Sequence, residues 1–330
     1  MKEKIHDYTL RFGITSVCNI RCNFCNKDGK WAGKKVLPKE LSEILKAAYQ
    51  CGIRRVHFTG GEPLMCDGLE DVILDIPKDY EVIFTTNGVL LDKYSDAFKK
   101  RINRINFSLE SIYPSKQAEE TNMEEKIARR QIENLKEISS FVSLTKLNMV
   151  ALREVNLNDL PDTFEFCQEY GIVYRMMELQ EDSVVPKPES YFEKNLVLKN
   201  EIIDKFERLG KLKRTFCKGD NFCTDYYLVG ESNVPVGVMY FVSLNFRCPG
   251  ERCKAIFVNT RGRVTACKSE GFNIEDFLMF KSFEEKVRLI EEAISVKDKM
   301  NEGEISYPEY HVSNYPVNRG GFVSVESSLK

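Results

Sequence analysis

Residues 9–25 read TLRFGITSVCNIRCNFC, a β-branched and aromatic run followed at once by three cysteines within eight residues. The run at 9–16 is typical of a buried strand. Three thiolates as close as Cys18, Cys22 and Cys25 can bind three corners of an iron–sulfur cube and leave one iron open to another molecule. A structural zinc site usually takes four Cys or His ligands, and the chain's three histidines lie outside this segment. The spacing favours an iron–sulfur cluster and leaves zinc as the alternative.

The first 180 residues alternate short apolar runs with longer amphipathic segments, which indicates repeated βα units. Strands are expected at 9–16, 55–59, 82–86, 104–109, 144–150 and 173–178. Helices are expected at 39–51, 69–76, 93–100, 124–138 and 160–170. Parallel strands with right-handed helical crossovers curl into a barrel. The predicted fold is therefore α/β, a partial (β/α)6 barrel of the TIM type.

The pattern changes after residue 182, where prolines open a loop. A helix is expected at 196–212, strands at 226–230 and 236–242, a hairpin from 255–259 and 264–266, and a last helix at 283–298. We therefore expect two domains: the barrel at 1–182, and a smaller α+β cluster-binding domain at 183–330.

Charge and composition exclude several classes of protein. Lys plus Arg is 48 and Asp plus Glu is 50, so broad adhesion to nucleic acid or to an anionic membrane is not expected. The longest apolar run, at 236–244, is far shorter than the roughly 20 residues that cross a bilayer. The first residues lead into no signal-peptide core. Eleven cysteines in a cytoplasmic chain are expected to be thiols or metal ligands rather than disulfides.

Two further motifs follow the next predicted strands. Gly60-Gly61-Glu62-Pro63 comes after the second strand, and Thr85-Thr86-Asn87-Gly88 after the third. Catalytic residues gather at the carboxyl ends of barrel strands. With the aromatic Phe24 just before the third cysteine, this order of motifs resembles the radical S-adenosylmethionine (radical SAM) superfamily.

The resemblance implies a chemistry. In that superfamily a [4Fe-4S] cluster cleaves S-adenosylmethionine (SAM), and the resulting 5′-deoxyadenosyl radical removes a hydrogen atom from the substrate. By resemblance Cys18, Cys22 and Cys25 are the catalytic cluster ligands. The resemblance places the following residues at SAM: Phe24, Gly60, Gly61, Glu62, Pro63, Thr86 and Ser108.

The chain further resembles the GTP 3′,8-cyclase family of molybdenum-cofactor biosynthesis, over nearly its whole length. The matching segments include 10–15, 105–110, 146–150 and 175–178. By resemblance Arg11, Lys146 and Arg175 face the substrate triphosphate, and Arg55 stands where the family carries a basic residue. His57, at a second such position, is only partly protonated near pH 7. The resemblance implies a nucleotide-type substrate and a flavodoxin- or ferredoxin-type electron donor.

A second cysteine triplet lies near the carboxyl terminus. By resemblance Cys248, Cys253 and Cys267 bind a second [4Fe-4S] cluster, so that the cofactors are two clusters and SAM. The first gap is four residues where the family has two, and Lys254-Ala255-Ile256 replace arginines of the family. The tail also lacks the family's terminal Gly-Gly.

Several alternatives stay open. Cys217 or Cys223 is a candidate fourth ligand of the second cluster, whereas Cys66 is interpreted as a packed thiol. The departures from the family leave two functions to weigh: a radical enzyme acting on a nucleotide, or a two-cluster radical enzyme that modifies a peptide or another small metabolite. A zinc-stabilised binding module is the third hypothesis.

Overall fold

A computed structural model describes residues 6–25, 35–180, 190–217, 224–240, 253–267, 273–278 and 281–304. Six parallel strands form the centre of the molecule, and each pairs with the next in chain order. They are β1 (His6–Thr15), β2 (Ile53–Gly60), β3 (Glu81–Thr86), β4 (Arg104–Ser108), β5 (Leu144–Val150) and β6 (Val173–Met177). The prediction of a partial α/β barrel is confirmed.

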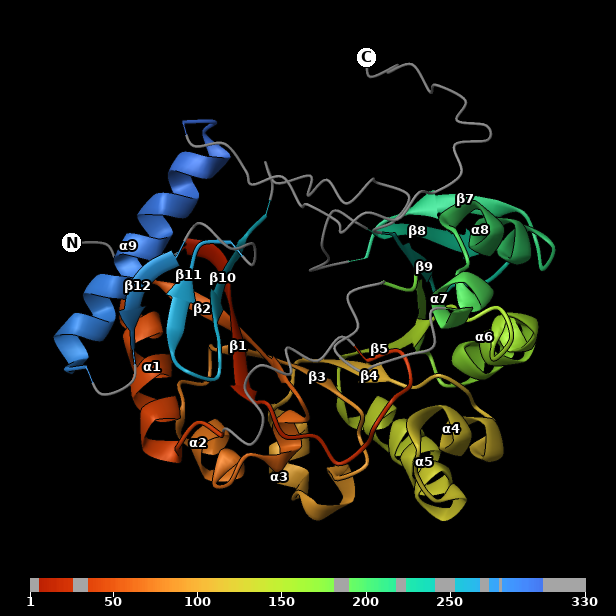
Figure 1. Ribbon diagram of the computed structural model, residues 1–330, viewed down its shortest axis with the longest axis horizontal. Helices are drawn as coiled ribbons and strands as arrows, with labels where there is room; N and C mark the ends of the chain where they lie inside the picture. Colours follow the sequence, from red (N-terminus) through yellow and green to blue (C-terminus); the bar gives the residue numbers. More distant parts are fainter. Residues whose placement is uncertain are drawn as a thin grey trace.

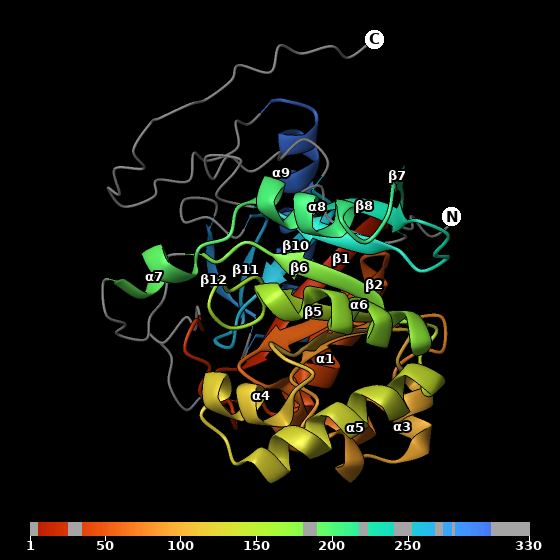
Figure 2. The ribbon, with the colours of Figure 1, turned by 90° about the vertical axis from the view of Figure 1, so that its right-hand side faces the viewer.

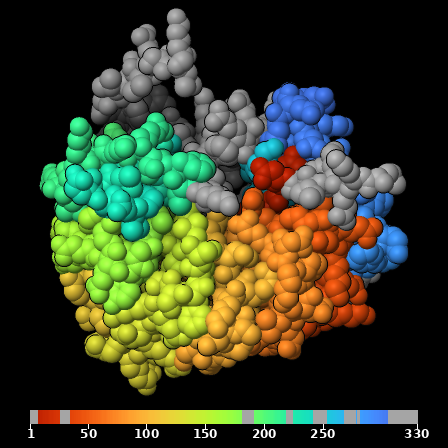
Figure 3. Space-filling view, turned by 180° about the vertical axis from the view of Figure 1, so that it is seen from behind, coloured from red at the N-terminus to blue at the C-terminus, as the bar shows by residue number. Residues whose placement is uncertain are grey.

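Helices connect these strands and cover their outer side, as Figure 1 shows. They are α1 (Pro38–Gln50), α2 (Leu69–Asp75), α3 (Asp96–Arg101), α4 (Pro114–Thr121), α5 (Glu125–Phe141) and α6 (Leu160–Glu169), with short 3-10 turns η2 (Pro63–Met65), η3 (Leu91–Lys93) and η4 (Leu157–Asp159). From behind, these parts of the chain make one continuous outer surface (Figure 3).

Side chains on the strands alternate between this helical layer and the barrel interior. The apolar set packs under the helices and includes Phe12, Phe58, Phe84 and Phe107, all fully buried. Burying each such side chain contributes about 1.5–3 kcal/mol. Many of the residues between them are polar or charged, such as Arg11, His57 and Asn106, although Ile83 of β3 is apolar, so the interior of the barrel is a largely polar compartment enclosed by an apolar shell.

The described strands of the carboxyl-terminal half extend both edges of the same sheet. On the β6 side lie β9 (Val236–Met239), β8 (Thr224–Val229) and β7 (Leu212–Thr215), and on the β1 side lie β10 (Ala255–Val258), β11 (Arg263–Thr265) and β12 (Asn273–Phe277). One sheet therefore contains strands from both sides of residue 182, where we expected the boundary between two domains. β10 runs parallel to β1, with Thr9 beside Ala255.

The remaining helices are α7 (Ser190–Asn195), α8 (Lys199–Glu207) and α9 (Phe283–Asn301). Figure 2 shows α9 above the barrel strands and α4 beside α5 below them. The buried ammonium of Lys286 in α9 bonds Glu43 of α1 at 2.6 Å, which fixes α9 on the barrel. Among the described helices, none combines the length and apolarity needed to cross a membrane.

Several elements differ from the sequence prediction. The helix expected at 196–212 is shorter, because α8 covers only Lys199–Glu207 and strand β7 begins at Leu212, while α7 before it was not expected. The strand β12 and the helix α4 were not expected. α4 escapes the periodicity argument because it has only eight residues and its buried face carries Gln117, Glu120 and Thr121, with Ala118 as its one buried apolar side chain.

Candidate active site

The cysteine loop, residues 17–25, begins just after the carboxyl end of β1. Cys18, Cys22 and Cys25 are all partly exposed and none is in a disulfide. The amide of Cys25 donates to the carbonyl of Cys22 at 3.3 Å, which turns the chain between them. The structure thus brings three accessible thiols to the edge of the barrel where the other motifs end.

The backbone at the end of β2 packs closely against the start of this loop. The amide of Gly61 donates to Thr15 O at 2.6 Å, and the amide of Glu62 donates to Val17 O at 2.7 Å. A Cβ on Gly61 would lie 2.2 Å from Val17 O, and Gly60 has a φ of +133° that only glycine adopts without strain. The two glycines let the β2 backbone support the chain that enters the cysteine loop.

Glu62 links the ends of β2 and β3. Its carboxylate accepts hydrogen bonds from the Thr86 hydroxyl at 2.6 Å, from the Asn87 amide at 2.7 Å and from the Leu64 amide at 3.0 Å. Burial raises the pKa of Glu62 to about 7, against the lowering effect of these three donors. A positive group such as the amine of an amino acid would stabilise the charged form there.

Asn87 connects this carboxylate to the first cysteine. Its side-chain amide donates to Asn19 Oδ1 at 2.8 Å and lies 3.8 Å from Cys18 Sγ. The backbone carbonyl of Asn87 accepts a hydrogen bond from the buried side-chain amide of Gln131 at 2.7 Å. The same amide lies 3.2 Å from the backbone oxygen of Ser108. Glu62, Thr86 and Ser108 therefore lie on neighbouring strand ends beside the cysteine loop.

Five basic residues line the barrel interior. Arg11, His57, Arg104, Lys146 and Arg175 come from β1, β2, β4, β5 and β6, and all but Arg11 are buried. Burial lowers the pKa of His57 well below its ordinary value, and the charges of Arg11, Arg104 and Arg175 lower it further. The ring is therefore neutral among cations, and the compartment favours an anion.

Neutral polar side chains hold some of these groups in place. Arg175 donates from Nε and Nη2 to Asn148 Oδ1 at 2.9 and 2.6 Å, while His57 Nε2 lies 2.7 Å from Thr85 Oγ1. Lys146 Nζ lies 3.4 Å from the hydroxyl of Tyr226 and above its ring. These amide and hydroxyl partners orient the basic side chains within the barrel.

The structure places the expected substrate residues in two regions of the barrel. Lys146 and Arg175 sit within β5 and β6, so they lie inside the barrel. Arg55 forms ion pairs with Glu81 at 2.7 Å and with Asp7 at 3.5 Å, near the amino-terminal ends of the strands. Its charge is already balanced by carboxylates.

The second cysteine group lies at the other end of β1. Cys253 precedes β10, which runs parallel to β1, and Cys267 follows the antiparallel strand β11. Both therefore lie level with the amino-terminal part of β1. Cys217 is buried against Val173 and Tyr226. Cys248 and Cys223 lie outside the described residues.

The first cysteine group fits an iron–sulfur cluster. Its three donors are thiols on one loop, and within the described ranges no three His, Cys, Asp or Glu side chains converge as ligands of a single ion. A cube distributes three thiolates over three irons instead. Cys18, Cys22 and Cys25 would hold it, with the buried carboxylate of Glu62 on the adjoining strand end.

Comparisons with known proteins identify the family. The model of the radical SAM superfamily matches residues 13–167. A probable GTP 3′,8-cyclase of Archaeoglobus fulgidus is 30% identical over 301 residues, which cover 89% of this chain and 96% of that protein. The chain belongs to the radical SAM superfamily. Within it, the chain is a divergent relative of the GTP 3′,8-cyclase family.

Other relatives match over shorter stretches of this radical SAM enzyme. A probable GTP 3′,8-cyclase of Methanococcus vannielii is 33% identical over 177 residues, 52% of this chain and 58% of that protein. The structure of Streptococcus suis SuiB bound to precursor peptide SuiA superposes with a TM-score of 0.56 at 16% identity, covering 79% of this chain and 60% of that one. This structural likeness confirms the fold. Membership of the superfamily implies one [4Fe-4S] cluster and SAM as cofactors.

Sequence reasoning missed several residues of the site. Asn87 belongs to the motif at 85–88, but its contact with Cys18 joins segments that are distant in sequence, so only the folded structure shows it. Arg104 alternates with Asn106 and Ser108 along β4, and that period of two is the signal that would have placed it inside the barrel. Nothing in the local sequence pointed to the buried Gln131.

Proposed function

We propose that this radical SAM enzyme acts on a purine nucleoside triphosphate in the manner of a GTP 3′,8-cyclase, as a step of molybdenum-cofactor biosynthesis. The observation that carries the proposal is the set of basic side chains inside the barrel, between the first cysteine group and Cys253 with Cys267. Several basic side chains gathered in one compartment favour a compact polyanion through charge-assisted hydrogen bonds. The similarity to the Archaeoglobus fulgidus cyclase along nearly its full length supports the same assignment.

In this proposal each group of residues has a distinct task. Arg11, Lys146 and Arg175 bind the triphosphate, with Arg104 adding charge from β4, and Arg55 remains a candidate at the amino-terminal end. The cluster and SAM, when bound, supply the 5′-deoxyadenosyl radical. Glu62 and Thr86 hold SAM at the strand ends, and the enclosed barrel keeps water away from the reacting ribose. The radical would take a hydrogen atom from the ribose, and the ribose carbon radical would then add to the purine. The purine radical so formed would take one electron from the reduced donor and one proton to give the product.

The second cysteine group completes the proposed site. Cys253 and Cys267, with Cys248, would hold a second [4Fe-4S] cluster at the opposite end of the barrel, where it would contact the base. A fourth ligand from Cys217 or Cys223 would close that cluster to the substrate. A flavodoxin- or ferredoxin-type protein would supply the electrons.

One observation favours a different substrate. Lys254, Ala255 and Ile256 replace arginines of the cyclase family, and the last two are buried strand residues of β10. Lys254 keeps a charge and lies over the ring of Tyr8, whereas Ala255 and Ile256 offer no charge or hydrogen bond to a nucleotide. The second candidate is therefore a two-cluster radical enzyme that modifies a peptide or another small metabolite.

The deciding experiment uses anaerobically reconstituted protein with SAM, a reductant and GTP. Mass spectrometry quantifies 5′-deoxyadenosine and cyclised nucleotide. Near-stoichiometric amounts of both would support the cyclase proposal. 5′-Deoxyadenosine without altered GTP would reject it and favour the second candidate, and the same assay would then be run with other nucleotides and with peptides.

A further inference from the structure

The middle of the cysteine loop is bound by a helix that the catalytic motifs do not include. The residues on either side of Cys22 make paired backbone contacts with the carboxyl end of α4: Arg21 N donates to Thr121 O, and Asn23 N donates to Glu120 O, both at 3.0 Å. Both carbonyls belong to the last turn of α4, where the helix leaves carbonyls for partners outside itself. Cys22 is thereby held between two fixed backbone positions.

Side chains strengthen the same junction. The amide of Asn122 donates to Arg21 O at 2.8 Å and to Asn23 Oδ1 at 2.9 Å. The carboxylate of Glu120, itself buried, accepts from Asn23 Nδ2 at 3.4 Å and from the Tyr191 hydroxyl of α7 at 2.7 Å. Six hydrogen bonds therefore surround the segment that carries Cys22.

Asn122 adopts an unusual backbone conformation to reach the loop. Its φ of 51° makes it the one non-glycine residue with positive φ among those described. Asparagine tolerates this left-handed region better than most residues, but the conformation is still sparsely populated. Strained residues persist where the surrounding contacts determine them, and they cluster at functional sites. Here the helix ends in a turn that aims an amide at the cysteine loop.

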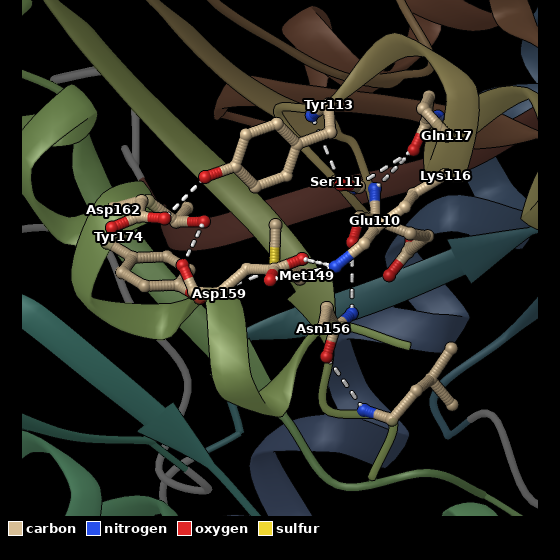
Figure 4. Close-up of polar contacts among 12 residues, drawn as sticks. Glu110, Ser111, Tyr113, Lys116, Gln117, Met149, Asn156, Asp159, Asp162 and Tyr174 are labelled. Carbon is tan, nitrogen blue, oxygen red and sulfur yellow. Dashed lines mark hydrogen bonds and ion pairs between the residues drawn. The ribbon is translucent and has the colours of Figure 1, made fainter. Parts of the chain in front are cut away.

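α4 is itself fixed to the core of the site. The side-chain oxygen of Gln117 in α4 accepts hydrogen bonds from the backbone amides of Glu110 and Ser111, just after β4, at 2.9 and 3.0 Å (Figure 4). The same side chain donates to Gln131 at 2.9 Å, and Gln131 in turn binds the carbonyl of Asn87. A buried polar chain thus joins α4 to the strand end that contacts Cys18.

We infer that Glu120 and Asn122, with Tyr191, are positioning residues that shape the cysteine loop before iron is bound and retain the cluster afterwards. The glycine contacts fix the loop at Cys18, and the α4 junction fixes it at Cys22. Because both points are fixed before the cluster binds, two of the three thiols are already in place, and binding costs less conformational entropy of the loop. The inference concerns the cluster alone and does not depend on the identity of the substrate.

The test measures the cluster rather than turnover. The full chain is reconstituted anaerobically, without substrate, as wild type, Asn122→Gly and Glu120→Gln. Asn122→Gly permits the positive φ and removes the side chain that carries the amide. Iron and sulfide per chain, the EPR spectrum of the reduced cluster with and without SAM, and the rate of iron loss to a ferrous chelator are recorded. Losing one such contact is expected to speed iron loss by about three- to tenfold and to alter the EPR spectrum.

Two controls separate positioning from general stability. Glu119→Gln makes the same chemical change one residue away, on the exposed side of α4. Ile44→Val removes a buried methyl group from α1, far from the loop in sequence, and lowers stability without touching it. Both controls should keep the wild-type spectrum and lose iron within about twofold of the wild-type rate. Wild-type iron loss and spectrum in Asn122→Gly and Glu120→Gln would overturn the inference, and so would equal acceleration in the controls.

Discussion

The two cysteine groups lie at opposite ends of β1 and depend on different kinds of structure. The first stands on a loop that is held by close glycine contacts, by Asn87 and by the end of α4. In the second group, Cys253 and Cys267 flank a β-hairpin that pairs with β1, and Cys267 packs against Ala266 and Met300. The first is surrounded by polar groups able to receive a polar cofactor. The second is placed by sheet pairing, so its neighbours can change with little effect on the barrel.

The largest expected effect comes from removing a ligand of the first group. Cys22→Ala should reduce SAM cleavage to background, because the cluster loses one of three thiolates. The measurement is 5′-deoxyadenosine formed by the anaerobic, reduced protein. Cys66→Ala is the matched control, since that buried thiol donates to Val36 O and lies outside the loop; it should retain cleavage. Sustained 5′-deoxyadenosine from Cys22→Ala would contradict the assignment.

A change at the second group should separate the two halves of the reaction. In Cys253→Ala we expect SAM cleavage to continue and the modified substrate to disappear, because the first group and its supports are untouched. Both products are quantified in one mass-spectrometric assay, with Cys167→Ala in α6 as a buried-thiol control. Unchanged product in Cys253→Ala would remove the second group from the mechanism.

The barrel and its cysteine loop could be predicted because their signals are local. The strand at 9–16 and the triplet that follows are adjacent in sequence, and the expected strand bounds lie within about three residues of those observed. These features depend on periods of two or 3.6 residues, which a sequence displays directly.

The rest depends on contacts between distant segments. Asn122 meets Arg21 across 101 positions of the chain, and Gln117 meets Gln131 through two helices. The balance of Arg55 by Glu81 and Asp7 likewise follows from strand register. Polar residues on a short segment suggest an exposed loop when only the sequence is known. The helix α4 and its contacts with the cysteine loop were therefore not predicted.

The glycine contact offers a test of how the first group is held. In Gly61→Ala the new Cβ would meet Val17 O at 2.2 Å, so β2 and the loop must separate. We expect the apo protein to lose about 1–3 kcal/mol or more of unfolding free energy, as overpacked sites do. Gly171→Ala is the control, because its φ of +65° is strained but nothing lies within 4 Å. Denaturant midpoints of the three proteins are compared. Gly61, unlike Gly171, has no positive φ, so a loss in Gly61→Ala reports the close approach, and a wild-type midpoint in Gly61→Ala would contradict this explanation.

The smallest effect concerns the charge of Glu62. Its pKa of about 7 lies above the value of 4.5 for a free glutamate, so the folded protein binds a proton that the unfolded chain releases. Unfolding free energy must then fall as pH rises through that interval and level off above pH 7. Between pH 6 and 8 the loss is about 1 kcal/mol. In Glu62→Gln that component disappears, because the amide does not titrate. The measurement compares denaturant unfolding of both apo proteins at the two pH values, so that other titrating groups cancel in the difference. Parallel pH dependence would show that Glu62 is already ionised at pH 6, with its three donors outweighing burial, and the carboxylate would then be ready for a cationic ligand across the whole range.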